Sequence, residues 1–134
     1  MDRSLVIAQY IKISFNMQID DYHDVLTDDF YFRNPRIEIF GKNNYIKYAC
    51  DSQGLCIGET VKLTKVNEDK YIHVFNVPMF EKSSVNPDKF CVIQEISLKN
   101  GLISSSIYTY DLSELSDTTN EFLENIAQKH GKPI

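Results

Sequence analysis

The first helix is predicted by the spacing of polar and apolar residues near the start of the chain. From Ser4 to Met17 the polar side chains recur three or four residues apart, so a helix there is expected to be buried on most sides. Asp20 is expected to cap a short second helix over residues 21–26. Apolar residues at 45–49 predict a third helix that ends near Gly54.

Beyond the third helix the pattern changes to the alternation that is typical of strands. Four strands are expected there, after an earlier one at Phe30–Arg33 that Asn34-Pro35 ends, because proline lacks the N–H that a ladder needs. The four are Val61–Leu63, Tyr71–Phe80, Lys89–Leu98 and Leu102–Leu112. Asn100-Gly101 lies between the last two, and both residues accept the positive φ angles of a two-residue hairpin turn.

A C-terminal helix is predicted by Thr118 and Glu121, which have the spacing of a capping box. Its narrow apolar stripe should dock on the sheet or on a partner, and the helix should end at Gly131. No repeat or linker divides the 134 residues, so a single domain is predicted, with 114–134 as its helical tail.

The order of these elements predicts the fold class. Helices grouped ahead of consecutive hairpins indicate an α+β domain with an antiparallel sheet, not a βαβ fold. Several strands are apolar on both faces, since Tyr71 and Phe75 alternate with Ile72 and Val74. Such a sheet needs two covers. The helices supply one, and a second copy of the chain is the simplest candidate for the other, which predicts a homodimer.

Composition narrows the possible partners. The chain has a formal net charge of -5 without any cluster of lysine and arginine, which argues against nucleic acid. Its apolar runs are too short and interrupted to span a membrane. Cys50, Cys56 and Cys91 lack the pair spacings of zinc or redox sites, so buried, reduced thiols in a cytoplasmic protein are expected. His23 and His130 have no metal-ligand spacing, and no phosphate-binding glycine loop occurs, so neither metal nor cofactor is expected.

Two stretches of the chain resemble the nuclear transport factor 2-like superfamily, which includes ketosteroid isomerase and the SnoaL-like polyketide cyclases. One is residues 7–11 (IAQYI), and the other is Leu26 to Pro35 followed by Gly41-Lys42. The closing hairpin around Asn100-Gly101 is similar to the last two strands of that family. The likeness covers residues 4–113 and implies a cone-shaped, curved antiparallel sheet packed on N-terminal helices, here with an extra C-terminal helix.

For the isomerases of that superfamily, the resemblance implies a tyrosine and a protonated aspartate as an oxyanion hole, and a second aspartate before proline as the base. Tyr10 matches the tyrosine. Asn34 stands directly before Pro35 in place of the base, and an amide cannot take up a proton near neutral pH. Strand parity puts Gln94 in place of the late acid, whereas a shift by one residue puts Glu95 there.

These polar residues form a candidate site if they converge in an apolar cavity. Tyr10, Asn34 and Gln94 would then provide its hydrogen bonds. The expected lining is Phe30, Phe32, Tyr71, Phe75 and Ile96. Such a cavity suits a hydrophobic molecule that carries a carbonyl or hydroxyl group. The alternative is a filled core, in which Tyr10 bonds a backbone group and Asn34 caps the strand end.

Two titratable residues are further candidates for catalysis. His73 alternates with Tyr71 and Phe75, so it could face the same cavity and act as the base that Asn34 cannot be. A lone histidine on a strand is also a common structural hydrogen-bonder. Asp111 lies near the end of the last strand. The resemblance to SnoaL-like enzymes implies acidic residues around that rim. An aspartate at a strand end is equally ordinary loop chemistry.

Two functions from different classes are therefore expected. In the first, the chain is a SnoaL-like protein for a hydrophobic carbonyl compound. It would then be either an isomerase- or cyclase-type enzyme without the standard aspartate base, or a binding protein without turnover. In the second, it is a non-catalytic dimeric interaction module whose cavity is closed by core side chains. A toxin-immunity or sensory accessory domain is not separable from that module by sequence.

Overall fold

The computed structural model describes residues 2–52, 58–79 and 89–134. The predicted helix end near Gly54, the predicted strand end at Phe80 and the thiol of Cys56 lie outside the described residues. The helices are α1 (Arg3–Asn16), η1 (Ile19–Asp21), α2 (Tyr22–Val25), α3 (Lys42–Asp51), η3 (Leu112–Glu114) and α4 (Asp117–His130), η marking a 3₁₀ turn. The strands are β1 (Leu26–Arg33), β2 (Ile37–Phe40), β3 (Glu59–Asn67), β4 (Lys70–Pro78), β5 (Lys89–Lys99), β6 (Leu102–Thr109) and β7 (Lys132–Pro133).

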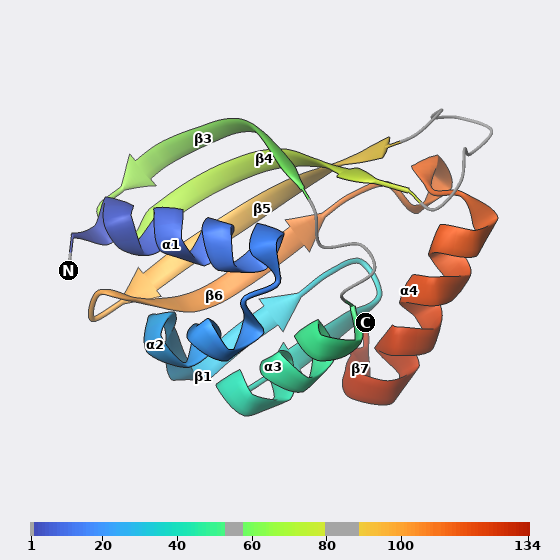
Figure 1. The fold of residues 1–134 in the computed structure, drawn as a ribbon, viewed down its shortest axis with the longest axis horizontal. Coiled ribbons are helices and arrows are strands. Elements are labelled where there is room, and N and C mark those ends of the chain that lie inside the picture. The colour runs from blue at the N-terminus through green and yellow to red at the C-terminus, as the bar shows by residue number, and fades with distance from the viewer. Residues whose placement is uncertain (1, 53–57, 80–88) are drawn as a thin grey trace.

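The described strands form one curved sheet in the order β3-β4-β5-β6-β1-β2-β7 (Figure 1). Neighbouring strands run antiparallel except β1 and β6, which pair in parallel from Leu26 opposite Ile103 to Arg33 opposite Ile107. The α+β class is confirmed, and the sheet is mixed where a purely antiparallel one was expected. No hairpin connects β1 to β6, because β2, α3 and three further strands lie between them in the chain. The local sequence therefore does not determine that these two strands run in parallel.

The helices cover one face of the sheet. α1 packs on β6, and α3 packs on β1 and β2 (Figure 1). The inward residues of β4 are buried, from Tyr71 at 5% exposure through His73 at 0% to Phe75 at 3%, while the alternate residues Ile72 and Val74 are half-buried. Period-two alternation therefore identified the inner face correctly.

The C-terminal helix packs on α3 and on the short strand β7, whereas its apolar stripe predicted docking on the sheet or on a partner. The His130 Nε2 atom lies 2.5 Å from the Asp51 carboxylate at the end of α3. Arg36, at the turn between β1 and β2, donates to the Asn120 side chain and lies 3.3 Å from the Glu124 carboxylate. Polar contacts at both ends thus hold α4 against the rest of the chain.

Two helix starts differ from the sequence prediction. Asp20 lies inside η1 and forms no cap for the second helix, which begins at Tyr22. The N-cap of α4 is Ser116, whose hydroxyl accepts the Thr119 N–H, so the helix begins ahead of the proposed capping box at Thr118. At both helix starts several adjacent residues are able to cap the helix, so the sequence alone does not identify which one does.

The predicted burial of the cysteines was wrong for the two described thiols. Cys50 lies on the solvent side of α3 and Cys91 on the outer face of β5, and both are exposed and free. In each case the neighbouring residue, Ala49 or Val92, takes the buried position. None of the described helices has the length and apolar character needed to cross a membrane.

The hairpin turn is confirmed at Asn100 and Gly101, which have φ angles of 54° and 80°. A Cβ atom at position 101 would meet no atom within 4 Å, so only backbone conformation opposes a side chain there. Left-handed backbone costs a non-glycine residue about 1–2 kcal/mol.

We predict that Gly101→Ala lowers the free energy of unfolding by about 1 kcal/mol, because alanine must adopt the left-handed conformation of the turn. Urea unfolding followed by circular dichroism measures the change. Lys99→Ala is the control, since it alters an exposed neighbour outside the turn. An unchanged unfolding midpoint for Gly101→Ala would contradict this account of the hairpin.

Candidate functional site

A cavity of about 90 Å³ lies between the helices and the inner face of the sheet. Aromatic side chains dominate its described lining. They are Phe15, Tyr22, Phe32, Tyr45, Tyr48, Phe75, Phe90, Tyr108 and Tyr110. The small polar side chains that join them are Ser14, Asn34 and Ser52. Small-molecule sites usually have volumes of about 300–1,000 Å³, so this cavity holds only a compact molecule.

Asn34 lines the cavity and shapes the turn between β1 and β2 at the same time. Its Oδ1 atom accepts the N–H groups of Arg36 at 2.8 Å and Ile37 at 3.0 Å. Its Nδ2 group donates to the Tyr48 hydroxyl at 3.3 Å. The strand-capping alternative is therefore observed, although the side chain also borders the cavity. The amide is a fixed hydrogen-bonding group with no basic atom.

Tyr10, His73 and Gln94 come together in a buried hydrogen-bond network, whereas the sequence predicted that Tyr10, Asn34 and Gln94 would meet in the cavity. The Gln94 amide donates to the Ser106 hydroxyl at 2.9 Å and to the Tyr10 hydroxyl at 3.4 Å. Its Oε1 atom is 2.8 Å from His73 Nδ1, which therefore donates as the protonated nitrogen. The Thr60 hydroxyl then donates to His73 Nε2 at 2.8 Å. None of these side chains belongs to the described lining of the cavity.

The orientation of β5 settles which residue points inward. Gln94 is 3% exposed and faces the helices. Glu95 is half-buried on the opposite face, where its carboxylate lies 2.5 Å from the Lys70 ammonium group. An inward glutamate that acts as a neutral acid is thus absent from this position, and an amide stands there instead.

His73 is separated from the cavity by aromatic rings. Its imidazole stacks on Phe75 with centroids 4.8 Å apart and lies 5.7 Å from the Phe15 ring. Burial lowers the pKa of His73, and the hydrogen bond to Gln94 opposes that effect. The side chain is therefore a neutral imidazole at neutral pH, with both nitrogens already bonded.

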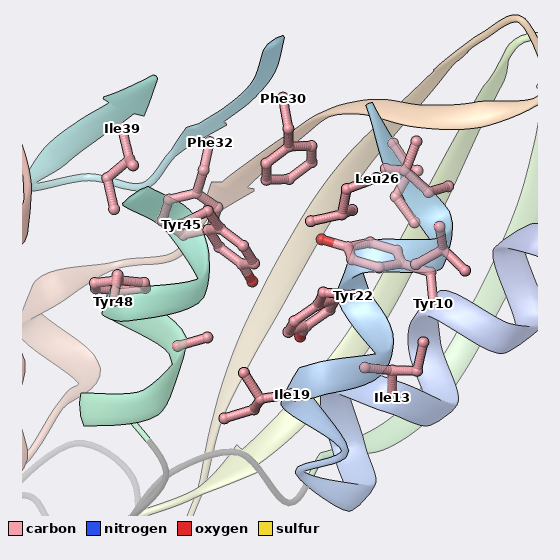
Figure 2. Packing of buried hydrophobic residues seen from close by; sticks show 14 of the residues in the cluster. Tyr10, Ile13, Ile19, Tyr22, Leu26, Phe30, Phe32, Ile39, Tyr45 and Tyr48 are labelled. Atoms are coloured by element: carbon pink, nitrogen blue, oxygen red, sulfur yellow. The ribbon is translucent and has the colours of Figure 1, made fainter. Parts of the chain in front are cut away.

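Three phenols from different helices meet at the cavity, and two of them, Tyr22 and Tyr45, line it. Figure 2 shows Tyr10, Tyr22 and Tyr45 projecting toward one another from α1, α2 and α3. Burial raises the pKa of Tyr10 to about 12, and burial also raises the pKa of Tyr45 well above its usual value. The Tyr22 hydroxyl bonds the Ser14 hydroxyl at 2.8 Å. Tyr10 and Tyr45 therefore stay protonated near neutral pH and act by hydrogen bonding.

The remaining predicted residues divide between the cavity, the core and the surface. Phe32 and Phe75 line the cavity. Phe30, Tyr71 and Ile96 are buried elsewhere in the core. Asp111 is exposed, and its carboxylate accepts the backbone N–H and hydroxyl of Ser113, at 2.9 Å and 2.7 Å, at the start of η3. That aspartate stabilises a helical turn and is outside the described lining.

Sequence reasoning missed the tyrosines that dominate the cavity. Tyr45 and Tyr48 are three residues apart on α3, which places both on one helix face toward the sheet. That spacing was a usable signal, but it served only to predict the third helix. For metal binding, the described residues contain no group of three histidine, cysteine, aspartate or glutamate side chains that could hold an ion.

We predict that His73 makes the fold sensitive to mild acid. Burial lowers the pKa of His73 in the folded state. In the unfolded chain this histidine has a pKa of about 6.5, so as pH falls through that value the unfolded chain binds more protons than the folded one. The free energy of unfolding should therefore fall as pH decreases from 7 to 5, by at most about 1.4 kcal/mol per pH unit from this group. Urea unfolding across that range should show a shallower pH dependence for His73→Asn. The exposed His23→Asn is the matched control and should behave like the unaltered protein.

Comparison with known proteins places the fold. No protein-family model and no curated protein sequence matches the chain. An LEH-like epoxide hydrolase of M. tuberculosis aligns over 96% of this chain and 95% of its own, at 13% identity and a TM-score of 0.70. A Kribbella flavida protein named for ketosteroid isomerase aligns over 82% and 78%, at 11% identity and a TM-score of 0.70. An NTF2-like protein of Cytophaga hutchinsonii aligns over 81% and 89%, at 14% identity and a TM-score of 0.65. The expected resemblance is confirmed at the level of structure, and the chain has the nuclear transport factor 2-like fold.

Proposed function

We propose that the protein binds a compact, mostly apolar molecule with one carbonyl or hydroxyl group in the tyrosine-lined cavity, without proton-transfer catalysis. The observation that carries this proposal is the chemistry of the lining. Its described side chains are serine, phenylalanine, tyrosine, asparagine, alanine, valine and leucine, and none of them exchanges a proton readily near neutral pH. Such a surface excludes water from an apolar ligand and offers it hydrogen bonds.

The positions of Asn34 and His73 support binding over turnover. A general base must lie within about 2.6–3.2 Å of the proton that it removes. Asn34 has no basic atom, and its oxygen is already occupied by two backbone N–H groups. His73 lies behind Phe15 and Phe75, with both ring nitrogens bonded. The enzyme names of two structural neighbours support a small-molecule role for the fold, which is also able to carry unrelated functions.

Tyr48 is the polar group best placed to meet a ligand. It lines the cavity, and its hydroxyl is held by Asn34 at 3.3 Å. The Tyr10 hydroxyl, in contrast, belongs to the Gln94 network behind the cavity. Comparing substitutions of Tyr48 and Tyr10 therefore separates an effect on ligand binding from an effect on packing.

We predict that Tyr48→Phe weakens binding of single-ring phenols and cyclic ketones about five-fold, because one neutral hydrogen bond of about 1 kcal/mol is lost. Tyr10→Phe, the matched control, should leave ligand affinity unchanged. Isothermal titration calorimetry on hits from a thermal-shift screen measures both. Equal affinity losses in the two variants would contradict the assignment of Tyr48. Rapid isomerisation of 3-cyclohexenone by the unaltered protein would contradict the absence of turnover.

We also propose that a second copy of the chain covers the outer face of the sheet. Ile93 is 47% exposed there, and it lies opposite the half-buried Val74 on β4. Ile72 and Ile107 extend this apolar surface, flanking Glu95 in the cross-strand register. An apolar patch in the middle of a sheet face is typical of a protein interface. The alternative role, a dimeric interaction module, rests on this surface and not on the cavity.

We predict that Ile93→Glu converts a dimer into a monomer, because a charge would be buried at the interface without a partner. Sedimentation velocity measures the change in mass. Leu5→Glu is the control, since Leu5 is 60% exposed on α1, away from the outer face of the sheet. A monomeric unaltered protein at micromolar concentration would overturn the dimer proposal and leave the cavity proposal intact.

The compartment is a further part of the proposal. Cys50 and Cys91 are exposed and free. Exposed free thiols persist in a reducing environment, where disulfides are rare. We therefore propose a cytoplasmic location.

A further inference from the structure

The ring of Phe15 stands between the cavity and His73. Phe15 lines the cavity, and its centroid lies 5.7 Å from that of the His73 imidazole. It also packs edge-on against Phe75, with centroids 5.3 Å apart. Because Phe75 lines the cavity as well, these two rings form the wall that separates the imidazole from a bound molecule.

Phe15 is the less firmly held ring of the two. Phe75 is 3% exposed at the centre of β4, whereas Phe15 is only partly buried. Phe15 is also the last residue but one of α1, just before the left-handed cap at Met17. The final turn of a helix has fewer backbone hydrogen bonds to restrain it than the interior has. Of the two rings that form this wall, Phe15 is therefore the one expected to move.

Gly58 provides the recess in which the Phe15 ring sits. A Cβ atom at position 58 would lie 2.4 Å from Phe15 Cε1 and 2.7 Å from Cζ. Non-bonded carbon atoms do not approach that closely, so a side chain at 58 would force the Phe15 ring or the backbone to shift. The ring's position thus depends on the absence of a side chain at Gly58.

We propose that Phe15, seated against Gly58, is the residue that sets the size of ligand that the cavity accepts. With the ring in place, the cavity of about 90 Å³ suits a single small ring or less. With the ring removed, the cavity extends to the imidazole of His73 and accepts a two-ring aromatic alcohol. This inference rests on the proposed binding function and names its size class.

Calorimetric titration with phenol and 1-naphthol tests the proposal. We expect Phe15→Ala to bind 1-naphthol at least ten-fold more tightly than the unaltered protein does. Phe90→Ala is the matched control. It also removes a phenyl ring from the lining, but that ring packs against Tyr110 and not against His73. Side-chain NMR signals of His73 should shift on 1-naphthol binding in Phe15→Ala and stay unchanged in Phe90→Ala. Unmoved His73 signals in Phe15→Ala would overturn the proposal.

Gly58→Ala tests whether the position of the Phe15 ring depends on the recess at Gly58. The added methyl group should push the Phe15 ring into the cavity and weaken phenol binding at least ten-fold, and phenol affinity equal to that of the unaltered protein would overturn the role of Gly58. If Phe15→Ala does not fold, Phe15→Leu carries the same expectation for 1-naphthol. Failure of the unaltered protein to bind phenol contradicts the proposed function instead, while the NMR comparison of the two alanine variants still decides the role of Phe15.

Discussion

The side chain of Asn34 connects the sheet to the cavity, and much of the structure depends on its three hydrogen bonds. Its oxygen closes the turn between β1 and β2, and its nitrogen holds the Tyr48 phenol of α3. Through that turn, β1 reaches β6 on one side while β2 reaches β7 on the other. A buried amide that loses a partner costs about 1–3 kcal/mol. The strand order and the cavity wall therefore cannot be altered independently at this point.

The fold was largely predictable because its local signals agree with its global arrangement. The Asn100-Gly101 turn, the alternation along β4 and the apolar face of α1 each correspond to an observed element. The short strands β2 and β7 were missed, since four and two residues contain too little alternation to register. The parallel pairing of β1 with β6 was also missed. It joins two strands that are far apart in the chain, so no single stretch of sequence encodes it.

The site was less predictable, because strand parity indicates the face of a residue and not its depth. Parity correctly turned His73 and Gln94 toward the helices. It could not show that Phe15, from a different element, would stand in front of them. Tyr45 and Tyr48 looked like ordinary core residues, since an aromatic helix face has the same pattern whether it fills a core or borders a cavity. Asn34 was identified because its place before proline is a local feature of the chain.

The network of Thr60, His73, Gln94 and Ser106 has a consequence for how this protein can change over evolutionary time. Each member satisfies the polar atoms of the next, and three of the four side chains are almost fully buried. Replacing one member alone leaves a buried donor or acceptor without a partner. Among descendants of this sequence, positions 73, 94 and 106 are thus expected to covary, either retaining polar residues together or giving way together to apolar ones.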